Sequence, residues 1–549
     1  MTVLRLNSNE GPRAPQVLLA ELAALDPELL RRYPDATAVE TALAGRTGVS
    51  PERVVVTAGA DEALDRICRV YAGPDRPVLL PEPTFDMLER FAALAGAPLV
   101  RVPWFTDVFP LEAILARLDN RIALVVIVSP NNPTGGVASR DDVRRIAAAA
   151  PRSLVLLDQA YIEYADEDIG PAVLDLANVV VVRTMSKAWG LAGCRVGYAV
   201  GSADVIAVLR AAGGPYPVAG PSLALALSQL RRGDVALHAH VTEVRAERAN
   251  LRELLCARGV DARASQANFV FADFGPRAAF VRDGLGARGI LVRDFPARAG
   301  LETSLRITLP GDAADFERLT SALDTVLAPQ AIVFDLDGVL ADVRESQRAA
   351  MMETAAAYGV SVTMEDIEAA LRAGDAANDW IVTQRLIEAR GAQADLETVT
   401  ARFQDLYLGT NGSPGLRQRE RLIVPRALLA PLSKRLPLAV VTGRPREEAR
   451  WFLERMEIAD LFGAVVCMED AARKPDPAPV RLALERLGVR RAWMVGNTPD
   501  DIRAAAGAGV VPLGVAAPGD DLTATAAALT RAGAARVLDR VADLGELLP

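Results

Sequence analysis

The chain has 549 residues, of which 51% are apolar and 24% charged, so it can bury more than one core and should fold as two or more globular domains. Its net charge of −9, without a Lys/Arg cluster, argues against nucleic-acid binding, and its apolar runs are strand-sized rather than membrane-spanning. Four cysteines lie far apart without metal-ligand spacing, which predicts a cytoplasmic protein without zinc that acts on small molecules: Cys68, Cys194, Cys256 and Cys467.

In the first part of the chain, short β-branched runs alternate with helical stretches. This alternation predicts an α/β fold with a mostly parallel sheet and helices on both faces. From 220 to 328, longer helical patterns surround two short strands and indicate a smaller α+β lobe, which a helix at 315–327 closes. The expected strands are 53–59, 77–83, 122–130, 153–161, 178–186 and 195–200, with 268–274 and 304–310 in the small lobe.

A second alternating pattern begins after a connector of only three residues, 328–330. We therefore predict two domains, at 1–328 and 331–549, and the short connector leads us to expect that they pack against each other. A helical insert at about 345–430 interrupts the second pattern. The expected strands of the second domain are 331–337, 438–443, 464–470, 492–498 and 510–516.

Histidine is nearly absent from the sequence. His238 and His240 are the only two, and they lie two residues apart in a helical pattern, where their side chains do not face each other. Packing or surface roles are therefore expected for both. Ser-His-Asp hydrolysis and histidine proton relays are nearly excluded, so the chemistry should depend on lysine, aspartate and cofactors.

Several segments of the first domain supply what a pyridoxal 5'-phosphate site needs. Lys187 follows an expected strand and precedes Arg195 by eight residues. The turn before Ala60 and Asp61 opens a helix whose free N–H groups can hold a phosphate. Asp158 ends a buried strand, where a carboxylate can keep a pyridine nitrogen protonated. Singly, each has an ordinary explanation: a solvated lysine, a helix cap and a strand-end acid.

Together with "LNSNEGP" (6–12), "RYPD" (32–35), "SPNNPTGG" (129–136) and "LRIT" (305–308), these segments resemble the fold type I aminotransferases, and within them the histidinol-phosphate aminotransferase family. The resemblance implies that Lys187 forms the Schiff base and moves the proton, and that Arg306 binds the substrate carboxylate. It also implies a homodimer, in which Tyr33 of a partner subunit reaches the cofactor phosphate. The other implied cofactor or substrate contacts are Asn9, Ala60, Asp61, Phe85, Asn132, Asp158, Tyr161, Ser186 and Arg195.

Two positions bear on how far the resemblance extends. Gln159 stands where the family usually has Glu, a change that we expect to be harmless because Asp158 carries the charge. Arg293 is a candidate for binding a distal phosphate on the substrate, although a surface arginine is nearly as plausible. The same framework supports a phosphothreonine-type decarboxylase and transaminases for other amino acids.

The second domain begins with "FDLDGVLAD" (334–342), which presents Asp335 and Asp337 at a strand end. A strand cap and a turn would explain one aspartate before a glycine, but not the motifs that follow. Thr442 can hold a phosphoryl oxygen and Lys474 is a fixed cation. The acidic turn at 495–502 suits Mg²⁺, a hard ion that prefers oxygen ligands.

These motifs resemble the haloacid dehalogenase superfamily, with the 345–430 insert as its cap. The resemblance implies that Asp335 is the nucleophile and Asp337 the general acid/base of a phosphatase, with Mg²⁺ bound by Asp335, Asp337, Asn497 and Asp501. Asn497 replaces the usual Asp, so metal affinity should be lower. Dehalogenases use Asn at a similar place, with Asp500 then at their spacing, but they lack a counterpart of Asp337.

The two resemblances describe consecutive reactions. Transamination of imidazole acetol-phosphate with glutamate gives histidinol phosphate and 2-oxoglutarate, and removing the phosphate is the next step of histidine synthesis. We therefore predict a bifunctional enzyme. The alternative is that the second domain is a weakly active docking or regulatory module.

Overall fold

The computed structural model describes residues 3–374, 378–410 and 413–548. Its contacts divide the chain into two compact units. The N-terminal unit comprises Arg5–Gly275 and Val292–Arg318, and the C-terminal unit comprises Met1–Leu4, Pro276–Leu291 and Leu319–Pro549. None of the helices within the described ranges is long and apolar enough to cross a membrane.

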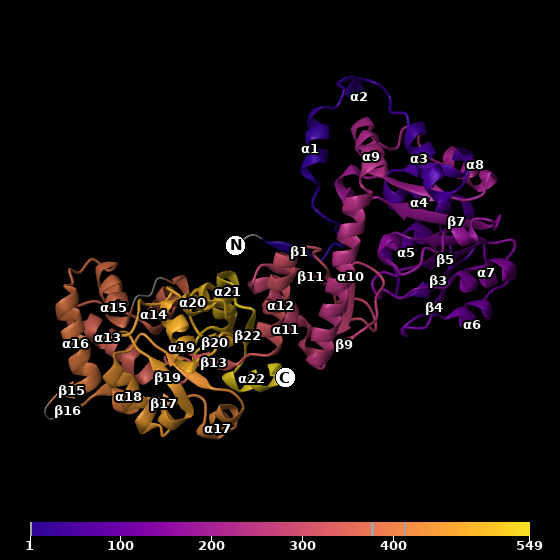
Figure 1. Cartoon of the computed structure of the whole chain (residues 1–549). Helices are drawn as coiled ribbons and strands as arrows, with labels where there is room; N and C mark the ends of the chain where they lie inside the picture. Colours follow the sequence, from indigo (N-terminus) through magenta and orange to yellow (C-terminus); the bar gives the residue numbers. More distant parts are fainter. Residues whose placement is uncertain (1–2, 375–377, 411–412, 549) are drawn as a thin grey trace. The chain divides into compact units, whose positions relative to one another are not determined.

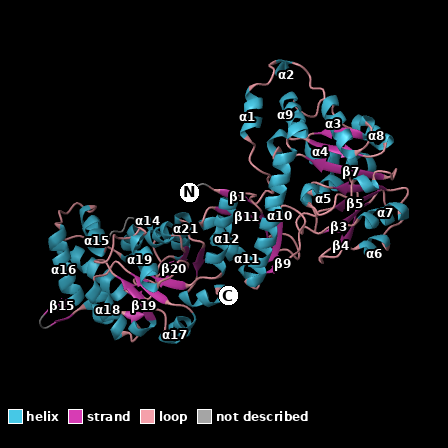
Figure 2. Cartoon of the chain, viewed as in Figure 1, coloured by secondary structure: helices cyan, strands magenta, loops and turns pink. Residues whose placement is uncertain are grey.

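A seven-stranded sheet forms the centre of the N-terminal unit (Figures 1 and 2). Its strand order is β2-β8-β7-β6-β5-β3-β4, and only β8 runs antiparallel to its neighbours. The predicted, mostly parallel sheet is therefore confirmed, with one strand added at an edge. The strands are β2 (Val54–Thr57), β3 (Val78–Glu82), β4 (Leu99–Pro103), β5 (Leu124–Val128), β6 (Leu154–Asp158), β7 (Val179–Thr184) and β8 (Gly197–Val200).

Helices flank this sheet, and one of them starts immediately after a strand. Helix α4 begins at Gly59, two residues after β2 ends, and packs its apolar face on β7 and β8. The first turn of α4 therefore lies at the edge of the sheet. The helices are α1 (Gln16–Ala23), α2 (Glu28–Arg31), α3 (Thr37–Thr47), α4 (Gly59–Tyr71), α5 (Asp86–Leu94), α6 (Leu111–Leu115), α7 (Arg140–Ala149), α8 (Ala203–Ala211), α9 (Gly220–Arg232) and α10 (Asp234–Ala257).

The smaller lobe contains a second sheet, in which β12 (Ser304–Thr308) pairs with β10 (Phe269–Asp273). β11 (Ile290–Asp294) places Arg293 opposite Arg306 of β12. Both histidines lie on α10, as predicted, and His240 is a packing residue whose Nε2 lies 3.1 Å from the Tyr164 hydroxyl. The other elements of this part of the chain are β1 (Leu4–Leu6), β9 (Asp261–Ala262), α11 (Ala278–Ala287) and α12 (Ala313–Leu327).

The C-terminal unit contains a six-stranded parallel sheet of order β19-β18-β13-β20-β21-β22. All five predicted strands are present, and β22 adds an edge strand. β13 lies near the middle, so the residues after β13, β18 and β20 meet at one edge. The elements are β13 (Ala331–Phe334), β18 (Leu438–Val441), β19 (Phe462–Val466), β20 (Ala492–Gly496), β21 (Val511–Val515) and β22 (Arg536–Leu538), with α17 (Arg426–Arg435), α18 (Arg446–Arg455), α19 (Ala478–Leu487), α20 (Pro499–Ala508), α21 (Leu522–Ala532) and α22 (Leu544–Leu547).

The insert after β13 folds as a helical cap. Helices α13, α15 and α16 pack together around a core that includes Met351, Phe403 and Tyr407 (Figure 1). The short ladder β14 (Ala341–Asp342) with β17 (Arg421–Leu422) pairs the two ends of the insert. The cap helices are α13 (Ala349–Ala357), α14 (Met364–Ala373), α15 (Asp379–Glu388) and α16 (Leu396–Leu408).

The predicted short connector is present, because α12 ends at Leu327 and β13 begins at Ala331. Helix α11 and the end of α12 belong to the C-terminal unit, where they cover Trp493. The Trp493 indole N–H donates to the Thr325 carbonyl at 3.0 Å, and its ring meets Phe280 edge-on. The contact-based units therefore divide the chain differently from the predicted boundaries, 1–328 and 331–549, which stay a prediction.

Candidate active sites

The N-terminal unit has a cavity at the carboxyl ends of β5, β6 and β7. Strand ends and the first turn of α4 meet here, which is where ligands bind in open α/β sheets. Of the residues predicted for the first site, all except Tyr33 line this cavity. They are Asn9, Ala60, Asp61, Phe85, Asn132, Asp158, Tyr161, Ser186, Lys187, Arg195, Arg293 and Arg306.

Lys187 lies three residues beyond the end of β7 and reaches into the cavity. Its Nζ is 3.4 Å from the Ser8 carbonyl oxygen and 5.6 Å from the centre of the Tyr161 ring. The Tyr161 hydroxyl in turn accepts a hydrogen bond from the side-chain amide of Asn9 at 3.0 Å. The amine therefore faces a polar, partly aromatic wall and forms no ion pair with a carboxylate of the described residues.

An anion cradle surrounds the first turn of α4. The free N–H groups of this turn carry the positive end of the helix dipole. The Arg195 guanidinium lies beside it, 3.2 Å from Asp61 Oδ2 and 3.4 Å from Ser186 Oγ. Glycine is required at Gly197, because a Cβ atom there would lie 2.3 Å from the Ala60 nitrogen. Backbone N–H groups, a hydroxyl and a guanidinium fit a phosphate monoester.

Asp158 ends β6 and is 3% exposed. Burial raises the pKa of its carboxyl to about 7, although the Ala160 N–H donates to it at 3.0 Å. A buried carboxyl without a paired cation fits a protonated pyridine nitrogen. With the anion cradle and Lys187, it meets the requirements of pyridoxal phosphate, which serves as an electron sink when bound.

Two arginines of the smaller lobe face the same cavity. Arg306 is 7% exposed and donates to Asn132 Oδ1 at 2.6 Å and to the Asn7 carbonyl at 2.8 Å. Arg293 is exposed on the neighbouring strand, with its guanidinium 5.8 Å from the Phe295 ring centre. A substrate with two anionic groups would therefore meet two separate cations.

Tyr33 and Gln159 lie outside this cavity. Tyr33 is 80% exposed and stacks on Tyr216, with ring centres 4.5 Å apart. Gln159 is buried and accepts two hydrogen bonds from Arg183 through Oε1, at 3.1 and 2.8 Å. Gln159 thus binds a neighbouring arginine through a neutral oxygen, which accords with the expectation that its replacement of Glu leaves Asp158 as the charged group.

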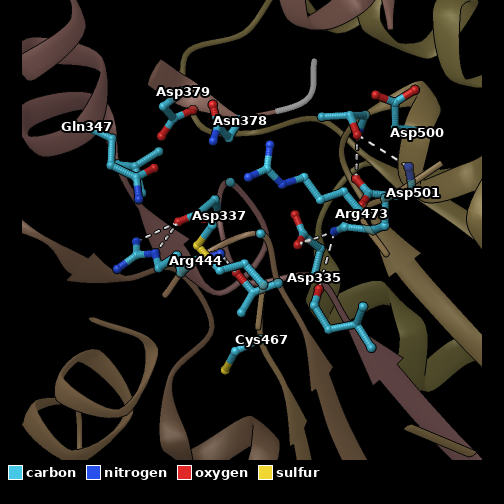
Figure 3. Close-up of a pocket in the computed structure, with 18 of the residues that line it drawn as sticks. Asp335, Asp337, Gln347, Asn378, Asp379, Arg444, Cys467, Arg473, Asp500 and Asp501 are labelled. Carbon is cyan, nitrogen blue, oxygen red and sulfur yellow. Dashed lines mark hydrogen bonds and ion pairs between the residues drawn. The ribbon is translucent and has the colours of Figure 1, made fainter. Parts of the chain in front are cut away.

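The second cavity lies at the edge of the parallel sheet in the C-terminal unit (Figure 3). It is lined by every residue predicted for the second site: Asp335, Asp337, Thr442, Lys474, Asn497 and Asp501. The cap supplies the facing wall, with Gln347, Asn378 and Asp379.

Lys474 joins two carboxylates of this cavity. Its Nζ is 2.6 Å from Asp335 Oδ1 and 2.5 Å from Asp501 Oδ1. Burial and the nearby Asp501 carboxylate raise the pKa of Asp335 to about 7, despite the opposing effect of Lys474. The same two carboxylates raise the pKa of Lys474 above its usual value, so it stays charged. Asp335 and a fixed cation can therefore face one phosphoryl group.

Asn497 has the character of a metal ligand. It follows β20, is 9% exposed, and its buried Oδ1 has no hydrogen-bond partner in the described part of the chain. A Cβ at Gly338 would lie 2.3 Å from its amide nitrogen, so glycine is needed there. No cluster of three His, Cys, Asp or Glu residues suited to a metal occurs among the described residues. An amide oxygen with Asp335 nearby still fits a hard cation such as Mg²⁺.

Asp501 and Asp500 have different partners, although they are adjacent in α20. Asp501 accepts from Lys474 and also closes the capping box of α20 with Thr498, whose hydroxyl donates at 2.7 Å. Asp500 is bound by Arg503 at 3.1 Å. The lysine thus reaches Asp501, the residue at the phosphatase spacing.

Asp337 is bound by an arginine that was not among the predicted site residues. Arg444 follows Thr442, to whose hydroxyl its backbone N–H donates at 3.1 Å. Its side chain contacts Asp337 and reaches Glu420 and the Tyr407 hydroxyl of the cap segment, at 3.0 and 2.9 Å. The sequence signal was present, because Arg444 belongs to the "VTGRP" motif.

Comparison with known proteins identifies both halves. Residues 1–323, more than half of the chain, match the model of aminotransferase class I and II. The chain belongs to this aminotransferase family. Residues 329–509 match the haloacid dehalogenase-like hydrolase model, so the aminotransferase carries a fused hydrolase domain. Both predicted resemblances are confirmed. The chain is thus a pyridoxal-phosphate-dependent aminotransferase, and hydrolases of the second family typically depend on Mg²⁺.

Individual relatives point the same way. The chain is 33% identical over 339 residues to a histidinol-phosphate aminotransferase of Paracoccus denitrificans, covering 60% of this chain and 90% of the relative. It is 37% identical over 342 residues to a histidinol-phosphate aminotransferase of Dinoroseobacter shibae, and the match covers 60% of this chain and 92% of that relative. A solved structure is also similar: the crystal structure of histidinol-phosphate aminotransferase from Sinorhizobium meliloti in complex with pyridoxal-5'-phosphate. The sequences are 28% identical and the TM-score is 0.54, and the match covers 59% of this chain and 90% of that chain.

Proposed function

We propose that this aminotransferase converts imidazole acetol-phosphate and glutamate into histidinol phosphate and 2-oxoglutarate, and that its hydrolase domain then removes the phosphate with Mg²⁺. The observation that carries the first half is the single cavity that joins Lys187, Asp158 and the α4 anion cradle to Arg293 and Arg306. The named relatives support the substrate.

In the first site, each side chain has a role that follows from its surroundings. The Lys187 amine forms no ion pair with a carboxylate of the described residues, so it would be free to hold the cofactor and to carry the proton that transamination moves. Ionised Asp158 would pair with the pyridine nitrogen. Arg306 would bind the carboxylate of glutamate, and Arg293 the phosphate of the keto substrate, so the two substrates would alternate in one cavity.

In the second site, the Asp335 carboxylate would attack phosphorus and form an acyl phosphate while the bond from phosphorus to the alcohol oxygen breaks. Asp337 would give its proton to that leaving oxygen. Water would then attack the phosphorus and return a proton to Asp337, which releases inorganic phosphate and regenerates Asp335. Lys474 and Thr442 would stabilise the charge on the transferred group, and Asn497 would help to hold Mg²⁺.

We also propose a homodimer, because Tyr33 lies on the surface rather than in the cavity of its own chain. In a dimer, Tyr33 of one subunit would reach the cofactor phosphate of the other. The four separate cysteines support the cytoplasm as the compartment in which the enzyme works.

Asp335→Asn tests the assignment of the two reactions. The variant should retain transamination of imidazole acetol-phosphate but release no phosphate from histidinol phosphate in the presence of Mg²⁺. Lys187→Ala should show the reverse. If the wild-type protein releases no phosphate from histidinol phosphate, the hydrolase domain is a docking or regulatory module instead.

A further inference from the structure

The cap places one carboxylate in the wall of the second cavity, and no ion pair to it is formed by the described residues. Asp379 is the first residue of α15, and Figure 3 shows it beside Gln347, across the cavity from Asp500 and Asp501. With the Gln347 amide oriented to satisfy both of its neighbours, its nitrogen donates to Asp379 Oδ2 at 3.0 Å and its oxygen accepts from Arg444 Nε at 3.1 Å. The other oxygen of Asp379 accepts no hydrogen bond from the described residues and can bind a ligand.

Two of the neighbouring cations already have carboxylate partners. Arg444 binds Asp337 and Glu420, and Arg348 binds Asp520 at 2.9 Å, with Glu368 at 3.7 Å. Arg473 lines the cavity, but the described residues contain no ion pair between it and Asp379. Asp379 therefore forms no ion pair with these cations among the described residues.

The surroundings of Asp379 disfavour its negative charge. Burial and the nearby Asp337 carboxylate raise the pKa of Asp379 to about 7, even though Arg444 and Arg348 act in the opposite direction. Glu448, which is 8% exposed and receives a hydrogen bond only from the neutral Gln404 amide among the described side chains, adds to the local negative charge. A bound cation would offset this cost.

The opposite side of the same cavity is suited to a phosphate. Lys474 and the nucleophile Asp335 lie on this side, and the buried Asn497 oxygen, which has no hydrogen-bond partner among the described residues, could bind the Mg²⁺ that accompanies the phosphate. A ligand that fills the cavity therefore meets a phosphoryl-binding side on the sheet and an anionic side on the cap.

We propose that the second site selects phosphate monoesters that also carry a protonated amine, and that the Asp379 carboxylate binds this ammonium group. The proposal rests on the phosphatase function proposed above and adds its selectivity. A keto phosphate lacks the cation, whereas the amine formed by transamination has it. The charge of Asp379 would therefore favour the product of the first site over its substrate.

The test compares three phosphate esters: histidinol phosphate, its deaminated analogue imidazolylpropyl phosphate, and p-nitrophenyl phosphate. Wild-type kcat/KM should favour histidinol phosphate over the deaminated analogue by about tenfold or more, because removing one partner of a buried charge pair is costly. Asp379→Asn should abolish this preference by lowering kcat/KM for histidinol phosphate alone. Hydrolysis of p-nitrophenyl phosphate should be unchanged. Asp405→Asn, which removes an exposed carboxylate on cap helix α16, should retain it.

A second readout needs no variant. The wild-type preference should disappear as the pH rises through the pKa of the substrate amine. Equal rates on the amine and its deaminated analogue, or an unchanged preference in Asp379→Asn, would overturn the role of Asp379 while leaving the phosphatase intact. Failure to hydrolyse any of the three esters would reject the phosphatase itself, and this proposal with it.

Discussion

Arg444 donates two hydrogen bonds to a single oxygen of Asp337, from Nε at 2.8 Å and from Nη2 at 2.5 Å. The same guanidinium binds Glu420, whose side chain is fully buried. One arginine therefore holds the proposed general acid/base of the strand β13 loop and also anchors the segment that leads out of the cap. The position of the proposed acid/base and the attachment of the cap therefore both depend on the Arg444 side chain.

Replacing Arg444 by Met should destabilise the C-terminal unit and abolish phosphatase activity. The fully buried Glu420 and the partly buried Asp337 would both lose this partner, and breaking a buried pair such as the one with Glu420 costs about 3–5 kcal/mol. Urea unfolding, together with assays of both activities, measures this. Arg426→Met is the matched control, because it breaks an exposed pair with Asp460 and should change little. Equal effects of the two substitutions would contradict the role of Arg444.

Lys187→Ala should remain folded and keep phosphatase activity, yet lose reversible transamination. Among the described residues that line the first cavity, Lys187 is the one lysine. Borohydride reduction of the wild-type enzyme, followed by peptide mapping, should place the cofactor on Lys187. Its recovery on a different lysine would refute the assignment.

Asp158 should make the stability of the cofactor-free enzyme depend on pH. Its carboxyl has a pKa of about 7 in the folded protein and an ordinary value of 3.8 in the unfolded chain, so the unfolded chain releases this proton first as the pH rises. The free energy of unfolding should therefore fall between those two values, with a contribution from this group of up to about 1.4 kcal/mol per pH unit. Asp158→Asn should remove this contribution, which urea titrations of both cofactor-free proteins would detect.

Binding of the cofactor should weaken the same pH dependence, because a pyridinium cation would pair with the ionised carboxylate. If the free energies of unfolding of cofactor-free Asp158→Asn and wild-type protein change with pH in parallel, then burial does not raise the pKa of the Asp158 carboxyl.

Asn497→Asp should lower the Mg²⁺ concentration needed for phosphatase activity, because a carboxylate attracts Mg²⁺ more strongly than an amide does. A Mg²⁺ titration of phosphate release measures this. Asp500→Asn is the control. Asp500 binds Arg503 rather than Lys474, so this variant should keep phosphatase activity. An unchanged or higher Mg²⁺ requirement in Asn497→Asp would show that Asn497 is not a ligand.

The strands and the strand-end residues could be predicted because their signals are local. Buried parallel strands are continuous apolar runs, and Asp158 and Asp335 directly follow such runs. Edge strand β4 was missed because its residues are largely exposed and include Arg101. Strand β22 is similarly short and exposed at one end.

The partners of the site residues were harder to predict, because they come from distant parts of the chain. The contacts of Arg444 with Glu420 and Tyr407 depend on how the cap folds back, and the cap sequence carries no readable code for this. Asp379 gave no signal at all, since an acid at a helix start usually serves only the helix dipole. Its place in the cavity wall follows from tertiary packing.

The most direct test of the central claim, that the two sites act in sequence on one metabolite, is phosphate release from imidazole acetol-phosphate with and without glutamate. Cofactor-loaded enzyme with Mg²⁺ should release little phosphate until glutamate is added, and release should then follow formation of the amine. Asp335→Asn should form the amine and stop there. Rapid phosphate release without glutamate would contradict the proposed order of the two reactions.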